Sequence, residues 1–263
     1  MTNFTYSKDL PDDLDLGKIV AVDCETMGLN PSRDRLCVVQ LSSGDGHTHI
    51  VQIEKDQKKA QNLTRLLKNK NILKLFHFGR FDIAILYSTF GLLASPVYCT
   101  KIASKIARTY TDRHGLKNLL TELLEIDISK QQQSSDWGAK TLTKAQVDYA
   151  ATDVLYLHAL REKLNEMLER ENRDDLANEC FKFLPFRAAL DIKGWNDIDI
   201  FEHKPGFINA PIENQLLEYS FLPKTNSGFS RLIRPRDDFF ISKKIRPKYR
   251  NSFRQGYRLC NTR

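Results

Sequence analysis

The segment Val20-Ala21-Val22-Asp23-Cys24-Glu25-Thr26 decides the fold, because it begins as a buried strand and ends in two carboxylates. Side chains alternate along a strand, so Asp23 and Glu25 project to the same side. Two close carboxylates repel each other unless a cation lies between them. The pattern predicts half of a site for oxygen-preferring divalent ions such as Mg²⁺ or Mn²⁺. For D-x-E alone, a strand end with two solvated acids is the alternative.

Short apolar runs on either side of turn residues predict how the chain continues from this strand. Strands over 18–24, 36–42 and 49–53 are separated by short turn-like segments, which favours an antiparallel meander. Alternating helices and strands then follow, and the chain from residue 101 onward is mainly helical. We therefore predict an α/β fold in which a mixed sheet is flanked by helices. The further elements are expected at 60–68 (helix), 71–76 (strand), 81–90 (helix), 97–99 (strand), 144–170 (helix) and 174–190 (helix).

Two later segments carry further acidic residues at positions that favour a ligand site. Asp82 follows a predicted strand and opens a helix, where it either faces a ligand crevice or complements the helix dipole. The spacing of Thr143 and Gln146 matches a capping box, which predicts a helix start. Tyr149 and Asp153 lie four residues apart in that helix and share one face. Alone, they are equally explained by a core tyrosine and a surface aspartate.

Together these residues predict phosphodiester hydrolysis. Four carboxylates can hold two metal ions about 3.5–4 Å apart, which stabilises both the attacking and the leaving oxygen of an in-line displacement. A tyrosine hydroxyl beside them can orient the attacking water or take part in its deprotonation.

Composition and charge divide the chain into two parts. The 263 residues are 41% hydrophobic, enough for a core, and carry a net charge of +7. The segment 205–263 holds twelve Lys and Arg against four Asp and Glu, or +8, so residues 1–204 hold −1. Five widely spaced cysteines without a C-x-x-C pair favour free thiols in a reducing cytoplasm. Neither a signal peptide nor a membrane helix is expected.

Five motifs resemble those of the ribonuclease D-like 3′–5′ exonucleases, in the branch named for four acids plus tyrosine. They are D-C-E-T at 23–26, F-H-F-G-R-F-D at 76–82, G-L-K-N-L-L at 115–120, Q-S-S-D-W at 133–137 and Y-A-A-T-D-V at 149–154. The resemblance covers roughly residues 17–203 and is greatest to the short, stand-alone nanoRNase C type. It implies a ribonuclease H-like fold and release of 5′-mononucleotides from a 3′ end.

The same resemblance implies a role for each acidic residue. Asp23 would bridge two Mg²⁺ or Mn²⁺ ions, and Glu25 and Asp153 would bind the ion on the nucleophile side. Asp82 would either support the metal ligands without binding an ion itself or bind the other ion. Tyr149 would position the water.

Substrate and assembly also follow from the resemblance. The short members degrade RNA dinucleotides and assemble as octameric rings, so RNA and a homo-oligomer are expected. Leu29, after Met27, would wedge against the terminal base, although a leucine after a glycine is also common in a core. Thr26 and His77 would lie along the scissile end. Longer structured RNA, single-stranded DNA and a non-catalytic RNA-binding role are the alternatives.

The charge distribution leaves two questions open. A catalytic domain with a net charge of −1 has little of the excess Lys and Arg that binds long nucleic acids. Lys101, Lys105, Arg108, Arg113 and Lys117 are candidates for holding a 5′ phosphate, or form a solvated helix face. We predict a catalytic domain at 1–204 and a basic, proline-containing, poorly ordered extension at 205–263, which is either an RNA-binding arm or dispensable.

Overall fold

The computed structural model describes residues 2–129, 132, 134–195 and 200–201. The chain divides into two units, Met1–Glu202 and His203–Arg263. The predicted basic extension at 205–263 therefore lies outside the described residues.

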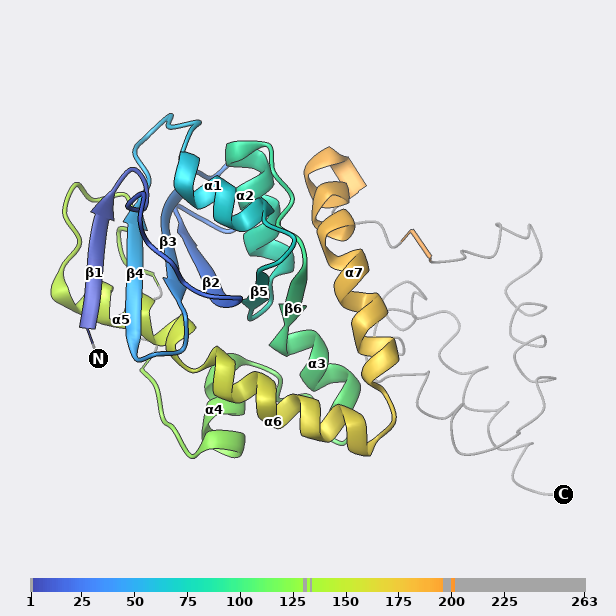
Figure 1. Cartoon of the computed structure of the whole chain (residues 1–263). Coiled ribbons are helices and arrows are strands. Elements are labelled where there is room, and N and C mark those ends of the chain that lie inside the picture. The colour runs from blue at the N-terminus through green and yellow to red at the C-terminus, as the bar shows by residue number, and fades with distance from the viewer. Residues whose placement is uncertain (1, 130–131, 133, 196–199, 202–263) are drawn as a thin grey trace, which may run out of the picture. The chain divides into compact units, whose positions relative to one another are not determined.

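A mixed sheet forms the centre of the first unit, which confirms the predicted α/β class. Within the described residues its six strands lie in the order β1-β4-β3-β2-β5-β6 (Figure 1). The meander β2-β3-β4 is antiparallel as predicted, while β5 pairs in parallel with β2 and β6 in parallel with β5. The bounds are β1 (Thr2–Ser7), β2 (Ile19–Thr26), β3 (Leu36–Ser42), β4 (His47–Gln52), β5 (Leu73–Phe76) and β6 (Val97–Cys99).

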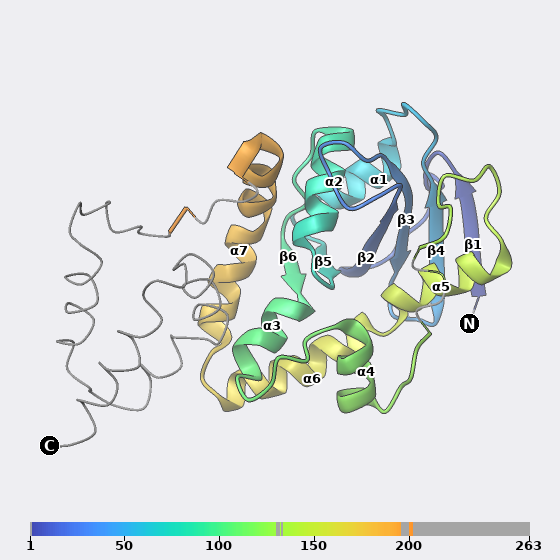
Figure 2. The same cartoon turned by 180° about the vertical axis from the view of Figure 1, so that it is seen from behind.

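Helices cover the sheet and bury its apolar side chains. The helix α5 contacts β2, β3 and β4 and crosses the face that is turned to the viewer in Figure 2. At the other edge, α7 packs against β6, α2 and α3. The bounds are α1 (Gln61–Lys68), α2 (Arg80–Phe90), α3 (Thr100–Ala107), α4 (Leu116–Leu124), α5 (Lys144–Leu155), α6 (Leu157–Arg170), α7 (Asp174–Leu190) and a π-helical turn η1 (Asp191–Trp195).

Two features differ from the sequence-based prediction. The edge strand β1 was not predicted; it pairs in parallel with β4, and its half-polar sequence T-N-F-T-Y-S lacks an apolar run. The single helix predicted over 144–170 is wrong, because the chain turns at Tyr156 and divides it into α5 and α6. The two halves pack on different partners, α5 on the sheet and α6 on α3 and α4, so a straight helix could not bury both apolar stripes.

One lysine is built into the core at the start of β5. Lys74 is fully buried, and its Nζ donates hydrogen bonds to the main-chain oxygens of Asn69, Ile72 and Ser95 at 2.8, 2.8 and 2.6 Å. Burial lowers the pKa of Lys74 to about 8. The ammonium group thus joins three main-chain carbonyls, of which that of Asn69 also accepts the N–H of Ile72. No helix among the described residues is long and apolar enough to cross a membrane.

Candidate active site

Three of the predicted carboxylates meet at the carboxyl end of β2. Asp23 and Glu25 come from this strand and Asp153 comes from α5. Each offers one oxygen atom, and these atoms lie within 4.8 Å of one another. Residues 130 positions apart are therefore brought together by the packing of α5 on the sheet.

Local sequence fixes where α5 begins and how closely this helix approaches the sheet. The predicted capping box is present: Gln146 N–H donates to Thr143 Oγ1 at 3.2 Å, and Thr143 N–H donates to Gln146 Oε1 at 2.9 Å. Ala150 and Ala151 are fully buried against Val38 and its neighbours. Small side chains let the helix axis approach the strands, which carries Asp153 to the strand end.

Tyr149 lies on the same helix face as Asp153, and its ring packs against Trp137. The two rings meet at 41° with 6.0 Å between their centroids, and the ring of Trp137 is buried. Its hydroxyl is hydrogen-bonded to the Asp153 carboxylate. Burial raises the pKa of Tyr149 most, and Asp153, Glu25 and Asp23 raise it further. The phenol is therefore protonated at neutral pH.

Asp82 has a different environment from the other three acids. Its carboxylate is buried, and Oδ1 accepts the main-chain N–H of Cys24, the residue between Asp23 and Glu25, at 3.1 Å. Burial raises the pKa of Asp82 to about 8, two main-chain hydrogen bonds oppose this shift, and Asp153 adds to it. Among the described residues, the cluster of three carboxylates does not include Asp82. Its contact braces the strand segment that carries the other acids.

The electrostatics of the cluster fit a divalent cation. Burial raises the pKa of Glu25 to about 9, with Asp153 and Asp82 adding to the shift. Burial also raises the pKa of Asp23 well above its usual value, and Asp82, Asp153 and Glu25 contribute further. Such crowding is unfavourable for ionised carboxylates alone and is relieved by a positive ion. An all-oxygen donor set suits Mg²⁺ or Mn²⁺.

Gln40 is a site residue that the sequence analysis missed. It lies directly opposite Asp23 in the β2-β3 pair, is fully buried, and its Nε2 donates to Asp23 Oδ2 at 2.7 Å. This contact fixes the orientation of the Asp23 carboxylate. The available signal was a single amide side chain inside the strand sequence L-C-V-V-Q-L-S. A buried polar residue in an apolar strand needs a partner.

The end of β2 and the loop after it hold the predicted substrate contacts Thr26, Met27 and Leu29. Thr26 Oγ1 donates to the main-chain oxygen of Gly28 at 2.5 Å. A Cβ atom on Gly28 would lie 2.3 Å from Asp34 Oδ2, so any larger residue here would have to displace the Asp34 carboxylate. Leu29 is 90% exposed and is therefore not a core residue.

His77 follows β5 and is anchored to α3. Thr100 Oγ1 donates to the main-chain oxygen of Phe76 at 3.2 Å and lies 2.9 Å from His77 Nδ1. The Thr100 hydroxyl thus fixes the orientation of the His77 ring through Nδ1.

Three of the basic residues proposed for a 5′ phosphate form ion pairs with carboxylates instead. Arg108 is fully buried and pairs with Glu122, so its assignment to a phosphate is wrong. Arg113 also pairs with Glu122, at 3.4 Å, and Lys117 pairs with Asp127 at 2.9 Å. Lys101 lies in the first turn of α3, with its Nζ 4.0 Å from the centroid of the Phe78 ring.

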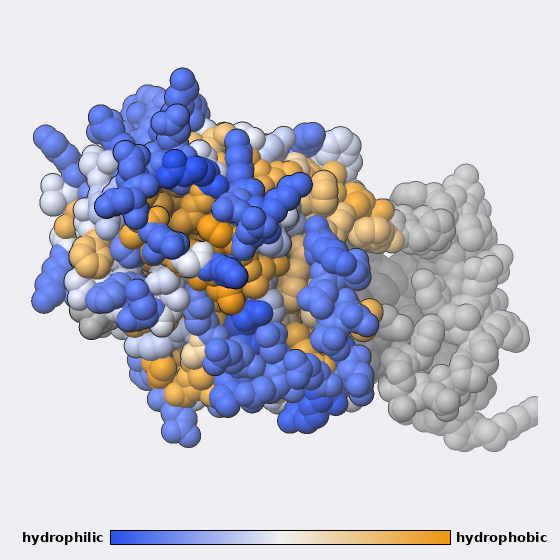
Figure 3. Space-filling view, viewed as in Figure 1, coloured by the Kyte–Doolittle hydropathy of each residue, from blue (hydrophilic) through white to orange (hydrophobic). Residues whose placement is uncertain are grey.

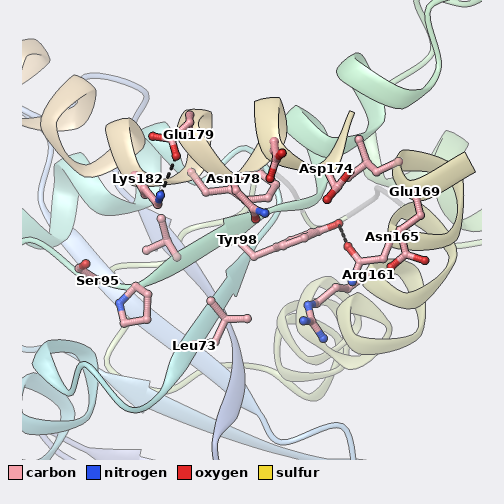
Figure 4. A pocket seen from close by; sticks show the side chains of 15 residues that line it. Leu73, Ser95, Tyr98, Arg161, Asn165, Glu169, Asp174, Asn178, Glu179 and Lys182 are labelled. Atoms are coloured by element: carbon pink, nitrogen blue, oxygen red, sulfur yellow. Dashed lines mark hydrogen bonds and ion pairs between the residues drawn. The ribbon is translucent and has the colours of Figure 1, made fainter. Parts of the chain in front are cut away.

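A separate cavity of about 550 Å³ lies between β6, α6 and α7 (Figure 4). It includes Leu73, at the start of β5, and so opens at the opposite end of the strands from the carboxylate cluster. In Figure 4, Tyr98 points across it and donates to Asn165 at 2.9 Å. Its carboxylates outnumber its cations, which disfavours binding of a phosphate. The charged residues that line it are Glu169, Asp174, Asp175, Glu179, Arg161 and Lys182.

Comparisons with known proteins place this geometry in a family. Residues 3–169 match the family described as 3′-5′ exonuclease. Ribonuclease D of Granulibacter bethesdensis is 34% identical over 154 residues, which are 59% of this chain and 38% of that protein. The chain thus spans about two fifths of the length of the curated relatives it matches.

Solved structures extend the likeness. NrnC of Brucella melitensis is 57% identical with a TM-score of 0.75, over 78% of this chain and 100% of that chain. The same protein has been solved with bound Mg²⁺ and bound to pGG. RNase D of Escherichia coli, an exoribonuclease involved in structured RNA processing, is 25% identical with a TM-score of 0.58, over 65% of this chain and 45% of that chain. These matches confirm the predicted resemblance, and the chain belongs to the 3′–5′ exonuclease family.

Proposed function

We propose that this protein is a metal-dependent exoribonuclease that hydrolyses short RNA, down to dinucleotides, to 5′-mononucleotides from the 3′ end by a two-metal-ion mechanism. The observation that carries the proposal is the meeting of Asp23, Glu25 and Asp153 within 4.8 Å, beside the Tyr149 hydroxyl. A buried group of carboxylates with a protonated tyrosine is suited to phosphodiester hydrolysis.

Each residue has a distinct part in this proposal. Asp23, Glu25 and Asp153 hold the divalent ions, Mg²⁺ or Mn²⁺, and Asp82 supports them through the Cys24 N–H. When bound, the ions would activate the attacking water and stabilise the charge on the leaving oxygen. The Tyr149 hydroxyl donates a hydrogen bond to Asp153, so its oxygen can accept a hydrogen bond from the water and orient it.

A short RNA substrate is supported by the surroundings of the acids. Leu29 projects from the loop after β2 with most of its surface in solvent, as a wedge against the terminal base requires. Met27 is exposed beside it, and Thr26 and His77 flank the strand end. The relative NrnC, which this chain matches over the whole of that chain, has been solved with pGG. Trimming of longer RNA is the second candidate, favoured by the likeness to E. coli RNase D.

An exposed apolar surface supports a homo-oligomer, with an octamer as the expected size. Hydrophobic residues gather over the upper end of α7 (Figure 3), where Phe186 and Trp195 are exposed. Exposed large apolar side chains in a cluster commonly mark a protein interface. We further propose that residues 1–204 form the catalytic domain and that the extension 205–263 is dispensable for dinucleotide cleavage.

The decisive experiment is cleavage of 5′-labelled RNAs of increasing length, starting at the dinucleotide, with Mg²⁺ or Mn²⁺ and a matched DNA series. The proposal expects the dinucleotide to be consumed fastest. Rates that rise with length would instead indicate a trimming exonuclease. Asp23→Asn removes a metal-binding carboxylate and should lower kcat/KM on the order of 10³-fold or more. Unchanged hydrolysis by this variant would refute the metal assignment, and no hydrolysis by the wild type would favour a non-catalytic RNA-binding role.

A further inference from the structure

Phe78 combines an exposed ring with an unusual backbone conformation. Its φ of 64° lies in the left-handed region, which favours glycine, and its side chain is 49% exposed. The next residue is a glycine, yet Gly79 has a φ of −53°. The positive φ therefore falls on the aromatic residue and not on its neighbour. Strain of this kind persists where the surrounding structure imposes it, and it gathers at functional sites.

The surroundings hold the Phe78 turn in place. Cys99 ends β6 directly before α3, and its thiol is buried. Burial raises the pKa of this thiol most, and the main-chain N–H groups of Ile102, Gly79, Lys101 and Phe78 oppose the shift. At the start of α3, the Thr100 hydroxyl donates to the main-chain oxygen of Phe76 at 3.2 Å, which ties the end of β5 to this helix. Lys101 Nζ lies 4.0 Å from the Phe78 ring centroid, a cation–π contact that orients the ring.

The position of this ring relative to the acids follows from the sheet register. Ala21 of β2 pairs with Leu75 of β5 in parallel, so the same register continued by two residues sets Asp23, within β2, beside His77, the first residue after β5. Phe78 comes directly after His77. The loop with Leu29 leads from β2 to β3, the neighbour of β2 on the opposite side from β5. In the strand order, β2 with Asp23 and Glu25 therefore stands between the segment that carries Leu29 and the segment that carries Phe78, and both of these apolar side chains are exposed.

We infer that Phe78 is a substrate-binding residue that stacks on the base of the nucleotide on the 5′ side of the scissile phosphate. This inference rests on the proposed function, in which Leu29 contacts the terminal base. Two apolar surfaces flank one cleavage centre, and a dinucleotide presents two bases to them. An aromatic ring stacks on any base with little sequence preference. Lys101 adds a positive charge beside the ring, which favours the phosphate that accompanies a stacked base.

The test removes the base from the substrate and the ring from the protein in the same experiment. A 5′-phosphorylated RNA dinucleotide is compared with the same molecule lacking the base of its 5′ nucleotide. For the wild type, loss of the base should lower kcat/KM by about 10- to 100-fold, mainly through KM. For Phe78→Leu, which keeps an apolar side chain without a ring, loss of the base should cost no more than about threefold. Phe78→Tyr should restore the full effect of the base.

Tyr110 offers a matched control, because it is also an exposed aromatic residue with a cation, Arg108, over its ring. It follows the C-terminal end of α3, whereas Lys101 lies in the first turn of that helix. Tyr110→Leu should retain the full effect of the base. An equal effect of the base in the wild type and in Phe78→Leu would overturn the inference.

Failure of the proposed function would look different. If the wild type cleaved longer RNA but neither dinucleotide, the short-RNA proposal would fail. The same comparison on longer RNA, with the base removed from the nucleotide next to the 3′ terminal one, would then decide the role of Phe78. A reduced effect of the base in Phe78→Leu would support stacking, and an equal effect would refute it.

Discussion

Replacement of Gln40 by methionine tests whether a neutral amide sets the geometry of the carboxylate cluster. Gln40 is fully buried and donates one hydrogen bond of 2.7 Å to Asp23 Oδ2. Its own Oε1 atom is buried and has no hydrogen-bond partner among the described residues. Gln40→Met keeps the length of the side chain and removes both the donor and the unsatisfied acceptor.

The expected effect can be worked out from these two atoms. A hydrogen bond to a charged carboxylate contributes about 1.5–3 kcal/mol. Supporting residues that orient a metal ligand typically change metal affinity or activity by about 10- to 100-fold. Loss of the unsatisfied Oε1 offsets part of the cost to folding, because a buried acceptor without a partner is itself unfavourable. We therefore expect a large effect on metal dependence and a small effect on the stability of the metal-free protein.

The assay is a titration with Mg²⁺ or Mn²⁺, followed by kcat/KM and by the rise in Tm that metal binding produces. Gln40→Met should shift both curves to about 10- to 100-fold higher metal concentration. Ser42→Ala is the matched control, since Ser42 is buried in the same strand but bonds to His47 and Gly44. A Gln40→Met variant with the metal dependence of the wild type would refute the reasoning.

Three further predictions concern stability and the extension. Lys74→Met removes three hydrogen bonds from a fully buried ammonium group and should lower the free energy of unfolding by about 3 kcal/mol in urea titrations; a loss below about 1 kcal/mol would show that the carbonyls find other partners. Phe78→Gly removes the strain of a positive φ and should stabilise the protein by about 1 kcal/mol, seen as a Tm about 2–4 °C higher, whereas an unchanged or lower Tm would contradict the strain argument. Deletion of 205–263 should leave dinucleotide cleavage intact, and loss of activity in a folded truncated protein would show that the extension takes part.

Much of the fold follows from local patterns in the chain. Apolar runs bounded by turn residues predicted β2, β3 and the meander, because a strand buried on both faces needs such a run wherever it lies. The capping box predicted the start of α5 for a similar reason, since its hydrogen bonds join residues only three positions apart. The five motifs predicted the exonuclease family, which the comparisons confirm.

Other features depend on partners that are distant along the chain. The strand β1 is held by β4, about forty-five residues later, and no local signal reveals that pairing. The division between α5 and α6 arises because each half packs on a different surface. Gln40 becomes a site residue only when β3 pairs with β2 in this register.

The chemistry of the site divides along the same line. Residue types and their spacing predict that Asp23, Glu25, Asp82, Tyr149 and Asp153 form a hydrolytic centre, because alternation in strands and four-residue spacing in helices are local geometry. Tertiary packing decides that three carboxylates gather in a cluster while Asp82 binds the Cys24 N–H. It also leaves the Phe78 side chain half exposed at the turn that follows β5. Distances between side chains on different elements depend on how those elements pack. Spacing along the sequence does not predict these distances.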